Sequence, residues 1–408
     1  MNANVGNGSR LHWRRLWRVL LWLALFAVLM TTIAWFLSRP DSPDGFYSAP
    51  ANARPVPGTL LRSEPFARDV PINARGWRIL YATTRGEGSP AVASALVLAP
   101  TATASAPRRL IAWTHGTTGA ATGCAPSLLE HPFANLPGLQ QAIDAGWVIV
   151  ATDYVGQGTP GQHPYLIGEG EARSALDSIR AVHAFTQLEL APETVVWGHS
   201  QGGHAALWTG ALAPTYAPEL RLLGVAAVAP ASDLKALVDA NQHTPVGRIM
   251  SSYILRAYAA EYPDVRLDEI VTGWKRPLVQ DIAAQCLAGK RALFSVAEAL
   301  LLGGSVYRIP PTQGALAARL EQNTPRQIMP MPLLIAQGES DELVLPNVQR
   351  AYVRARCAAG QALEYRSYAG HDHLSIVAAD SPYVADLIAW TQARFAGTAA
   401  PDSCKRLD

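Results

Sequence analysis

The chain has 408 residues, of which 49% are hydrophobic and 16% charged, a balance typical of a folded globular protein and unlike that of a disordered chain. Its 34 basic and 32 acidic side chains nearly cancel, which argues against nucleic acid as a partner and favours a small neutral substrate. A chain of this length forms either two domains or one large domain with an insertion.

The first segment has a marked charge bias. No acidic residue precedes Asp41, and an apolar run at 19–37 follows four arginines, Arg10, Arg14, Arg15 and Arg18. About 19 helical residues span roughly 30 Å, the hydrocarbon thickness of a bilayer. We therefore expect a basic cytoplasmic segment at 1–18 and a transmembrane signal-anchor helix at 19–37, with the rest of the chain on the outer, periplasmic or extracellular, side. The alternative is a cleaved signal peptide and a secreted protein.

Residues 38–57 are rich in Pro, Ser, Asp and Ala, which indicates an extended tether. After the tether, β-rich runs alternate with segments of helical periodicity. This alternation predicts right-handed crossovers and a mostly parallel sheet with helices on both faces. We expect strands at 77–83, 91–98, 109–114, 147–153, 194–198, 222–229, 332–337 and 363–368, and helices at 170–188, 202–212, 348–359 and 383–395.

The alternation of strands and helices is interrupted at 232–327. Apolar residues recur there at helical spacing, and no convincing strand appears among them. We interpret this range as a helical cap inserted into one α/β core, which comprises 58–231 and 328–408.

The sharpest chemical motif is Gly198-His199-Ser200-Gln201-Gly202, which lies between an expected strand and an expected helix. A serine on such a tight turn projects its hydroxyl above the sheet, and small neighbours relieve the crowding of the strained turn. The motif alone is weak evidence, but its position between strand and helix is specific. We interpret Ser200 as a nucleophile and the fold as an α/β-hydrolase.

A serine nucleophile requires a base, and the base requires a carboxylate that orients it. In this fold the acid and then the histidine follow the serine in the chain. Asp341 is the favoured acid because it follows a buried strand, with Glu339 and Asp233 as competitors. His373 is favoured over His371 as the base, because it opens the segment after the last expected strand.

The oxyanion of the reaction requires donors that are in place beforehand. One is the amide of the residue after the nucleophile, Gln201, and the other is expected from the Gly-rich loop at 113–119. We choose Thr117 as that second donor, with Thr118 as the alternative.

Four cysteines occur in a chain that we expect to be exported, and export favours disulfides. Their spacing does not match a zinc site, and by itself it leaves three pairings open among Cys124, Cys286, Cys357 and Cys404.

Together these motifs resemble the secretory lipase family of α/β-hydrolases, which includes the fungal lipase A enzymes. The similarity covers nearly everything after the tether. It is carried by six stretches in one order, namely 44–47 with 57–61, 115–119, 124–127, 153–159 with 163–166, 198–203 and 372–374.

The resemblance implies hydrolysis of acylglycerols and other carboxylic esters by a Ser, Asp, His triad under a helical cap, without a metal or organic cofactor. It also implies a disulfide between Cys124 and Cys286. The expected partners are a small-molecule ester or lipid and, through the N-terminal helix, a membrane. The alternatives are an acyltransferase or a peptidase with the same triad, or a noncatalytic ligand-binding protein.

Overall fold

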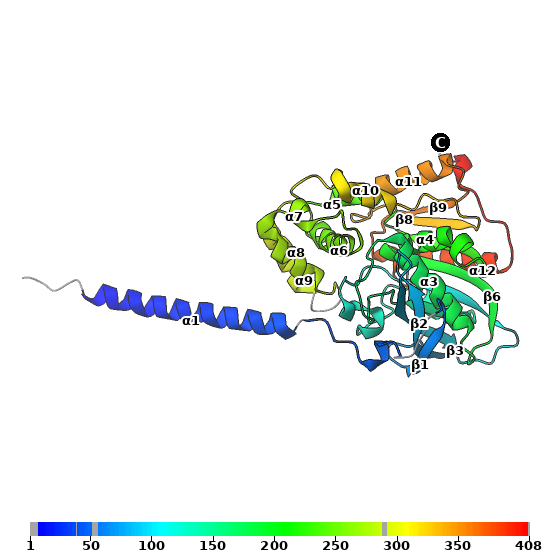
Figure 1. The fold of residues 1–408 in the computed structure, drawn as a ribbon, viewed down its shortest axis with the longest axis horizontal. Helices are drawn as coiled ribbons and strands as arrows, with labels where there is room; N and C mark the ends of the chain where they lie inside the picture. Colours follow the sequence, from blue (N-terminus) through cyan, green and yellow to red (C-terminus); the bar gives the residue numbers. More distant parts are fainter. Residues whose placement is uncertain (1–6, 38, 51–55, 288–291, 407–408) are drawn as a thin grey trace, which may run out of the picture. The chain divides into compact units, whose positions relative to one another are not determined.

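The computed structural model describes residues 7–37, 39–50, 56–287 and 292–406. The chain divides into two compact units, Met1–Arg39 and Pro40–Asp408. The first unit contains the helix α1 (Asn7–Leu37), and the second contains the sheet and the other helices, which Figure 1 colours along the sequence.

The range 19–37, expected to cross a membrane, forms the C-terminal part of α1. Among the residues that the structure describes, no helix combines the length and the apolar character that a membrane crossing requires. The transmembrane prediction is therefore not supported by the structure.

Nine strands form one sheet in the order β1-β2-β3-β5-β4-β6-β7-β8-β9. The first three pairs in that order, from β1 to β5, are antiparallel, and all pairs from β5 to β9 are parallel. This confirms the α/β-hydrolase class. The strands are β1 (Leu60–Phe66), β2 (Ala74–Thr84), β3 (Pro90–Pro100), β4 (Arg108–Thr114), β5 (Val148–Thr152), β6 (Leu190–His199), β7 (Arg221–Val228), β8 (Leu333–Gly338) and β9 (Glu364–Tyr368).

The central strands are buried on both faces because alternate side chains enter two different apolar clusters. On β6, Val195 and Trp197 belong to one cluster and Val196 to the other. A strand covered on both faces needs apolar residues at every position rather than at every second one. This explains the continuous apolar runs that predicted these strands.

Helices cover both faces of the sheet. One face packs against α3 (Gly168–His183), α4 (Gln201–Tyr216) and α11 (Pro346–Ala358), and the opposite face packs against α2 (Leu139–Asp144) and α12 (Pro382–Phe395). The cluster on the α2 and α12 side continues into the helices that follow β7.

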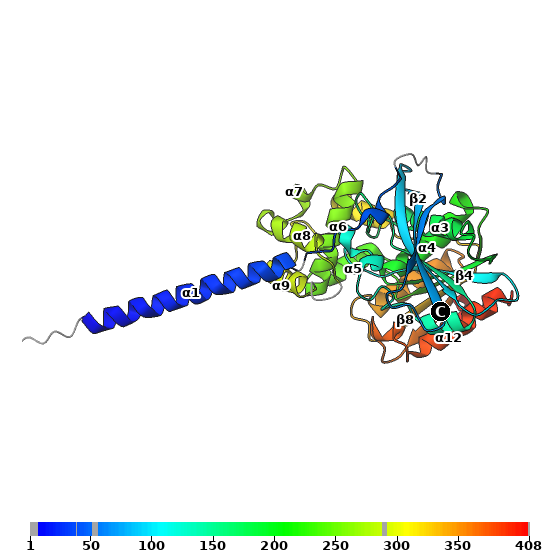
Figure 2. The same ribbon diagram turned by 90° about the horizontal axis from the view of Figure 1, so that it is seen from below.

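Among the residues described between β7 and β8, six α-helices occupy most of the range, and Figures 1 and 2 show α5 to α9 grouped beside the sheet. They are α5 (Leu234–Asn241), α6 (Pro245–Glu261), α7 (Leu267–Ile270), α8 (Arg276–Ala283), α9 (Ala292–Leu302) and α10 (Gly314–Gln322). We call residues 232–327 the cap. Its boundaries, and those of the core segments, stay predictions.

Two disulfides join Cys124 to Cys286 and Cys357 to Cys404. The first connects the loop after β4 to the cap, as the family resemblance implied. The second ties the C-terminal segment to α11. All four cysteines are therefore paired.

Candidate active site

Ser200 occupies the turn between β6 and α4. Its backbone has φ 58° and ψ −120°, a region that non-glycine residues rarely adopt and that costs conformational energy. The turn is tight enough that a Cβ on Gly202 would collide with the backbone oxygen of Thr114. Glycine at that position allows β4 and α4 to approach each other and leaves the serine side chain at the carboxyl end of the sheet.

His373 connects the serine to Asp341. Its Nε2 lies 2.9 Å from Oγ of Ser200, and its Nδ1 lies 2.8 Å from Oδ2 of Asp341. Since a carboxylate only accepts, Nδ1 carries the proton, and Nε2 is then free to accept the hydrogen of the serine hydroxyl. The structure thus brings together the three residues that the sequence indicated.

Asp341 is only 2% exposed and is held by several donors. Its Oδ1 accepts from the amides of Leu343 at 2.9 Å and Val344 at 2.8 Å, and its Oδ2 also accepts from Gln337 Nε2 at 3.1 Å. These bonds stabilise a buried carboxylate and fix the direction in which it faces His373.

The competing acids and the competing histidine have other partners. Glu339 pairs with Arg350 at 2.8 Å, and Asp233 caps α5 by accepting from the Ala236 amide at 3.0 Å. His371 Nδ1 lies 3.3 Å from the carbonyl oxygen of Ser375. This geometry favours Asp341 and His373 for the two roles.

His199, the residue before the nucleophile, also contacts His373. Its Nε2 donates to the carbonyl oxygen of His373 at 2.9 Å, and the two rings lie 4.7 Å apart. Burial lowers the pKa of His199 well below its usual value, and the neighbouring His373 lowers it further. A neutral His199 therefore braces the loop that carries His373.

Gln201 is fixed by a buried network under the start of α4. Its Nε2 donates to Glu171 Oε1 at 2.7 Å and to His163 Nε2 at 3.0 Å. Glu171 Oε1 also accepts from the Leu166 amide at 3.0 Å, and its Oε2 lies 3.1 Å from His204 Nδ1. The side chain next to the nucleophile thus has two fixed partners, which hold its backbone in place.

His204 extends this network to the end of the cap. Its Nε2 faces the carbonyl oxygen of Asn323 at 2.8 Å and must donate to it. Asn323 directly follows α10, and Trp208 donates to the same carbonyl at 2.9 Å. The network therefore links the residue after the nucleophile to the point where the chain leaves the cap.

The loop that carries Thr117 is also attached to the cap, through residues 286 and 287. The Leu287 amide donates to the carbonyl oxygen of Thr118 at 2.8 Å, beside a β-bridge between Gly119 and Cys286 and the disulfide of Cys286. Thr118 Oγ1 accepts from Gln157 Nε2 at 3.1 Å. The hydroxyl and the carbonyl of Thr118 are therefore both hydrogen-bonded, to Gln157 and to Leu287, whereas Thr117 lines the pocket.

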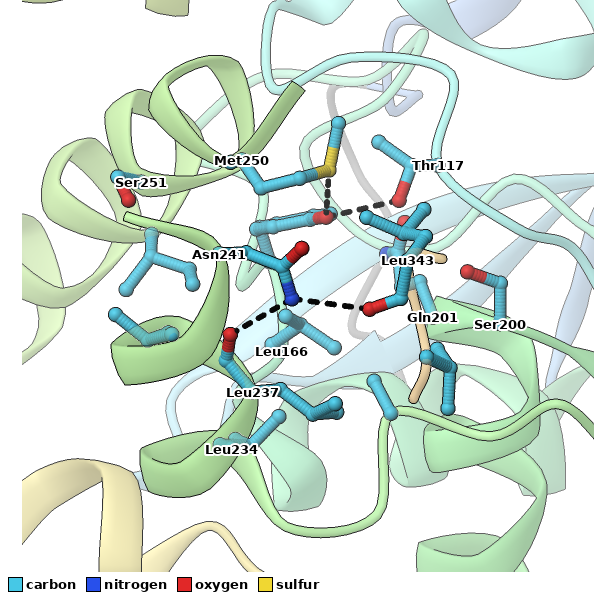
Figure 3. A pocket seen from close by; sticks show the side chains of 16 residues that line it. Thr117, Leu166, Ser200, Gln201, Leu234, Leu237, Asn241, Met250, Ser251 and Leu343 are labelled. Carbon is cyan, nitrogen blue, oxygen red and sulfur yellow. Dashed lines mark hydrogen bonds between the residues drawn. The ribbon is translucent and has the colours of Figure 1, made fainter. Parts of the chain in front are cut away.

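A pocket opens beside Ser200 and extends under α5 and α6. Thr117, Ser200 and Gln201 line it together, and Figure 3 shows a hydrogen-bonded chain from Thr117 through a tyrosine to Met250. Thr117 Oγ1 lies 2.8 Å from the hydroxyl of Tyr165, which donates to the sulfur of Met250 at 3.1 Å. The remaining walls are mainly apolar, with Leu166, Ala231, Leu234, Leu237, Val238, Ile254, Leu343 and Val344.

Sequence reasoning did not single out Glu171, Tyr165 or His199 for the site. Glu171 reaches it through tertiary contacts, which no local pattern reveals, whereas His199 stands inside the serine motif and Tyr165 inside the stretch 163–166. Among the described residues, no group of three or more His, Cys, Asp or Glu side chains is arranged to hold a metal ion.

The sequence of the chain is similar to those of known lipases. Residues 134–403 match the model of the secretory lipase family. Lipase 6 of Candida albicans is 25% identical, and the alignment covers 94% of this chain and 88% of the relative.

Two solved structures have a similar fold. Candida antarctica lipase A has a TM-score of 0.72 at 21% identity, with 88% of this chain and 87% of that chain covered. The rice cell wall degrading esterase LipA from Xanthomonas oryzae has a TM-score of 0.66 at 20% identity, with 85% of this chain and all of that chain, 100%, covered. The chain belongs to the secretory lipase family and is a carboxylic-ester hydrolase.

Proposed function

We propose that Ser200 hydrolyses carboxylic esters through a covalent acyl-enzyme. His373 removes the hydroxyl proton as Ser200 Oγ attacks the ester carbonyl, and the same proton passes to the departing alcohol. Water then attacks the acyl-enzyme with His373 as the base, which releases the acid and restores the serine. Asp341 keeps the imidazole in the required tautomer and stabilises the imidazolium that forms at each attack.

One observation carries this proposal, the continuous chain of hydrogen bonds from Ser200 through His373 to Asp341 at 2.9 and 2.8 Å. An unactivated serine hydroxyl is a poor nucleophile, and this arrangement is the one that activates it. The strained backbone at Ser200 supports the same role, because energetically costly conformations are concentrated at functional sites.

The negative oxygen of the tetrahedral intermediate is assigned to the backbone amides of Gln201 and Thr117. Both residues border the pocket beside Ser200. The network around Glu171 supports the first assignment, because a donor that is already fixed needs no reorganisation during the reaction. Each such donor contributes roughly 3 kcal/mol to the lowering of the barrier.

The acyl chain of an acylglycerol or related lipid ester is assigned to the pocket under α5 and α6. The pocket walls are mainly apolar, which suits the hydrocarbon part of such a chain. Transfer of the acyl group to an added alcohol is the competing outcome, and product analysis with and without that alcohol measures it.

An extracellular location is supported by membership of the secretory lipase family. Retention on a membrane through residues 19–37 stays a prediction from the sequence. Fractionation of cells that express the full chain or a variant without residues 1–39 tests it, because an anchored protein remains with the membranes only when that segment is present.

The enzymatic test compares p-nitrophenyl esters of short and long acyl chains. Hydrolysis is measured for the protein without residues 1–39 and for the same protein with Ser200→Ala. We expect both esters to be hydrolysed by the first protein and the rate to fall by at least a thousandfold in the second, roughly the loss seen when a serine nucleophile is removed. Equal rates from the two proteins would reject Ser200 as the nucleophile.

A further inference from the structure

A hydrogen-bond acceptor lies in the mainly apolar wall of the pocket. Asn241 ends α5 and is 7% exposed, and it lines the pocket together with Leu234, Leu237 and Val238 of the same helix. A buried amide side chain in an apolar wall carries a desolvation cost unless its polar atoms are paired.

The orientation of this amide is fixed by its two donors. Nδ2 donates to the carbonyl oxygen of Leu237 at 2.9 Å and to that of Leu343 at 3.0 Å. Since an amide nitrogen has two hydrogens and both neighbours only accept, the group cannot be turned over without losing both bonds.

The amide oxygen is left as an unused acceptor. Figure 3 shows it on the side away from those two carbonyls, toward the part of the pocket where Thr117 and Met250 lie. Within the described parts of the chain, no N–H or O–H group donates to this Oδ1.

A purely hydrocarbon chain in this pocket would displace water from Oδ1 and provide no donor in its place. Leaving a buried acceptor unpaired costs free energy, whereas a substrate that offers a donor at that position avoids the loss. Sites with a buried polar group discriminate against analogues that lack the matching group.

We propose that the acyl chain of the preferred substrate carries a hydroxyl group that donates to Asn241 Oδ1. This inference rests on the proposed function, since it names the substrate class of the same pocket. Asn241 is then a residue that determines specificity, and hydroxylated acyl esters are the class of substrate it selects.

The first experiment uses the unmodified sequence without residues 1–39 and three series of p-nitrophenyl esters. The acyl chains carry a hydroxyl, a methoxy group or no substituent at successive carbons. One hydroxyl position is expected to raise kcat/KM roughly three- to tenfold over both matched chains, the effect of one neutral hydrogen bond. The methoxy chains show whether the effect depends on hydrogen-bond donation or only on a polar substituent, because an ether oxygen accepts hydrogen bonds but cannot donate them.

The second experiment repeats the comparison with Asn241→Leu and with Val238→Ala as the matched control in the same wall. Asn241→Leu should abolish the preference for the hydroxyl chain, and Val238→Ala should change the rates on hydroxyl and plain chains together. The ratio of kcat/KM on the hydroxyl chain to that on the plain chain separates the two causes. Lost recognition changes this ratio, whereas a general loss of packing leaves it unchanged.

The inference is overturned if the unmodified protein hydrolyses plain esters readily and no hydroxyl position is preferred over its methoxy partner. Absence of hydrolysis for every ester contradicts the proposed function instead, so the two failures are distinguishable.

Discussion

At the scale of single residues, the hydrogen bond between Asp341 and His373 fixes which imidazole nitrogen carries the proton. The activity depends on that choice. Asp341 Oδ2 accepts from His373 Nδ1 at 2.8 Å. In Asp341→Asn the amide nitrogen donates at this position, so the imidazole turns to the tautomer that cannot accept the serine proton. We expect kcat to fall by roughly three to four orders of magnitude. Ester hydrolysis with matched circular dichroism spectra checks this, and an unchanged kcat contradicts it.

The two histidines of the loop after β9 should differ sharply. His373→Ala removes the base and should abolish measurable turnover, while His371→Ala, whose ring faces the carbonyl oxygen of Ser375, should keep kcat within about threefold, as ordinary substitutions away from reacting atoms do. Steady-state kinetics of the two variants show which histidine is the base. The assignment is wrong if the larger loss belongs to His371→Ala.

Glu171 is a positioning residue whose effect depends on hydrogen bonding rather than charge. In Glu171→Leu, Gln201, His204 and the Leu166 amide lose an acceptor, so the free energy of unfolding should fall by more than about 2 kcal/mol and kcat should fall more than KM changes. Glu171→Gln keeps a side-chain oxygen that can accept from Gln201 and from the Leu166 amide, and should largely restore both. Chemical unfolding and kinetics measure the two variants, and equal losses would contradict this role.

The three residues of the chemical step could be predicted from the sequence because each has a local signal. Ser200 lies in a motif between strand and helix, Asp341 follows a buried strand, and His373 follows the last strand. Glu171 has no such signal. It lies in α3, far from Gln201 in the sequence, and the two side chains come into contact only after folding. Asn241 is likewise an ordinary helix residue until α5 lies over the pocket.

At the scale of elements, the disulfides should separate stability from activity. The bond between Cys124 and Cys286 ties the Thr117 loop to the cap, whereas the bond between Cys357 and Cys404 ties α11 to the C-terminal segment. Replacing either pair with serine should cost roughly 2–4 kcal/mol of stability. The pair Cys124→Ser and Cys286→Ser should also lower kcat, because the oxyanion donor on the loop loses its support.

The matched control for this prediction is the other pair, Cys357→Ser with Cys404→Ser, which should keep kcat. Thermal unfolding and ester hydrolysis of both double variants provide the measurement. The prediction fails if kcat falls equally in the two.

The order of strands and helices could be predicted because the central strands are buried on both faces and read as continuous apolar runs. The expected strand at 91–98 corresponds to β3, and the expected helix at 202–212 to α4. β1 was not anticipated, since it is a partly exposed edge strand that contains Pro65. Individual cap helices were not separated either, because their apolar faces pack on one another and on the core, and no strand separates them along the chain.

At the scale of the whole molecule, buried histidines should make the fold sensitive to acid. Burial lowers the pKa of His115 to about 4 and that of His163 to about 3. In the unfolded chain both pKa values return to about 6.5. As the pH falls below that value, the two histidines become protonated in the unfolded state but stay neutral in the folded state. Stability is therefore greatest above pH 6.5 and decreases between about 6.5 and 4, by on the order of 3 kcal/mol for His115 alone.

Urea unfolding at several pH values checks this dependence. His163→Gln should make the decrease smaller, because glutamine keeps an acceptor for Gln201 without a titrating ring, while His115 still titrates. His131→Gln, at an exposed site, should leave the decrease in place. A free energy of unfolding that is constant from pH 7 to 4 is incompatible with neutral buried histidines.

The central claim, that Ser200 forms a covalent acyl intermediate with the help of His373, is tested most directly by mass spectrometry after reaction with a p-nitrophenyl alkylphosphonate. This reagent phosphonylates an activated serine and forms an adduct that water does not readily remove. The account predicts one adduct per chain, on the peptide that contains Ser200, formed in proportion to the loss of ester hydrolysis and absent from His373→Ala. A saturating adduct on another residue, or full hydrolytic activity after Ser200 is modified, would contradict it.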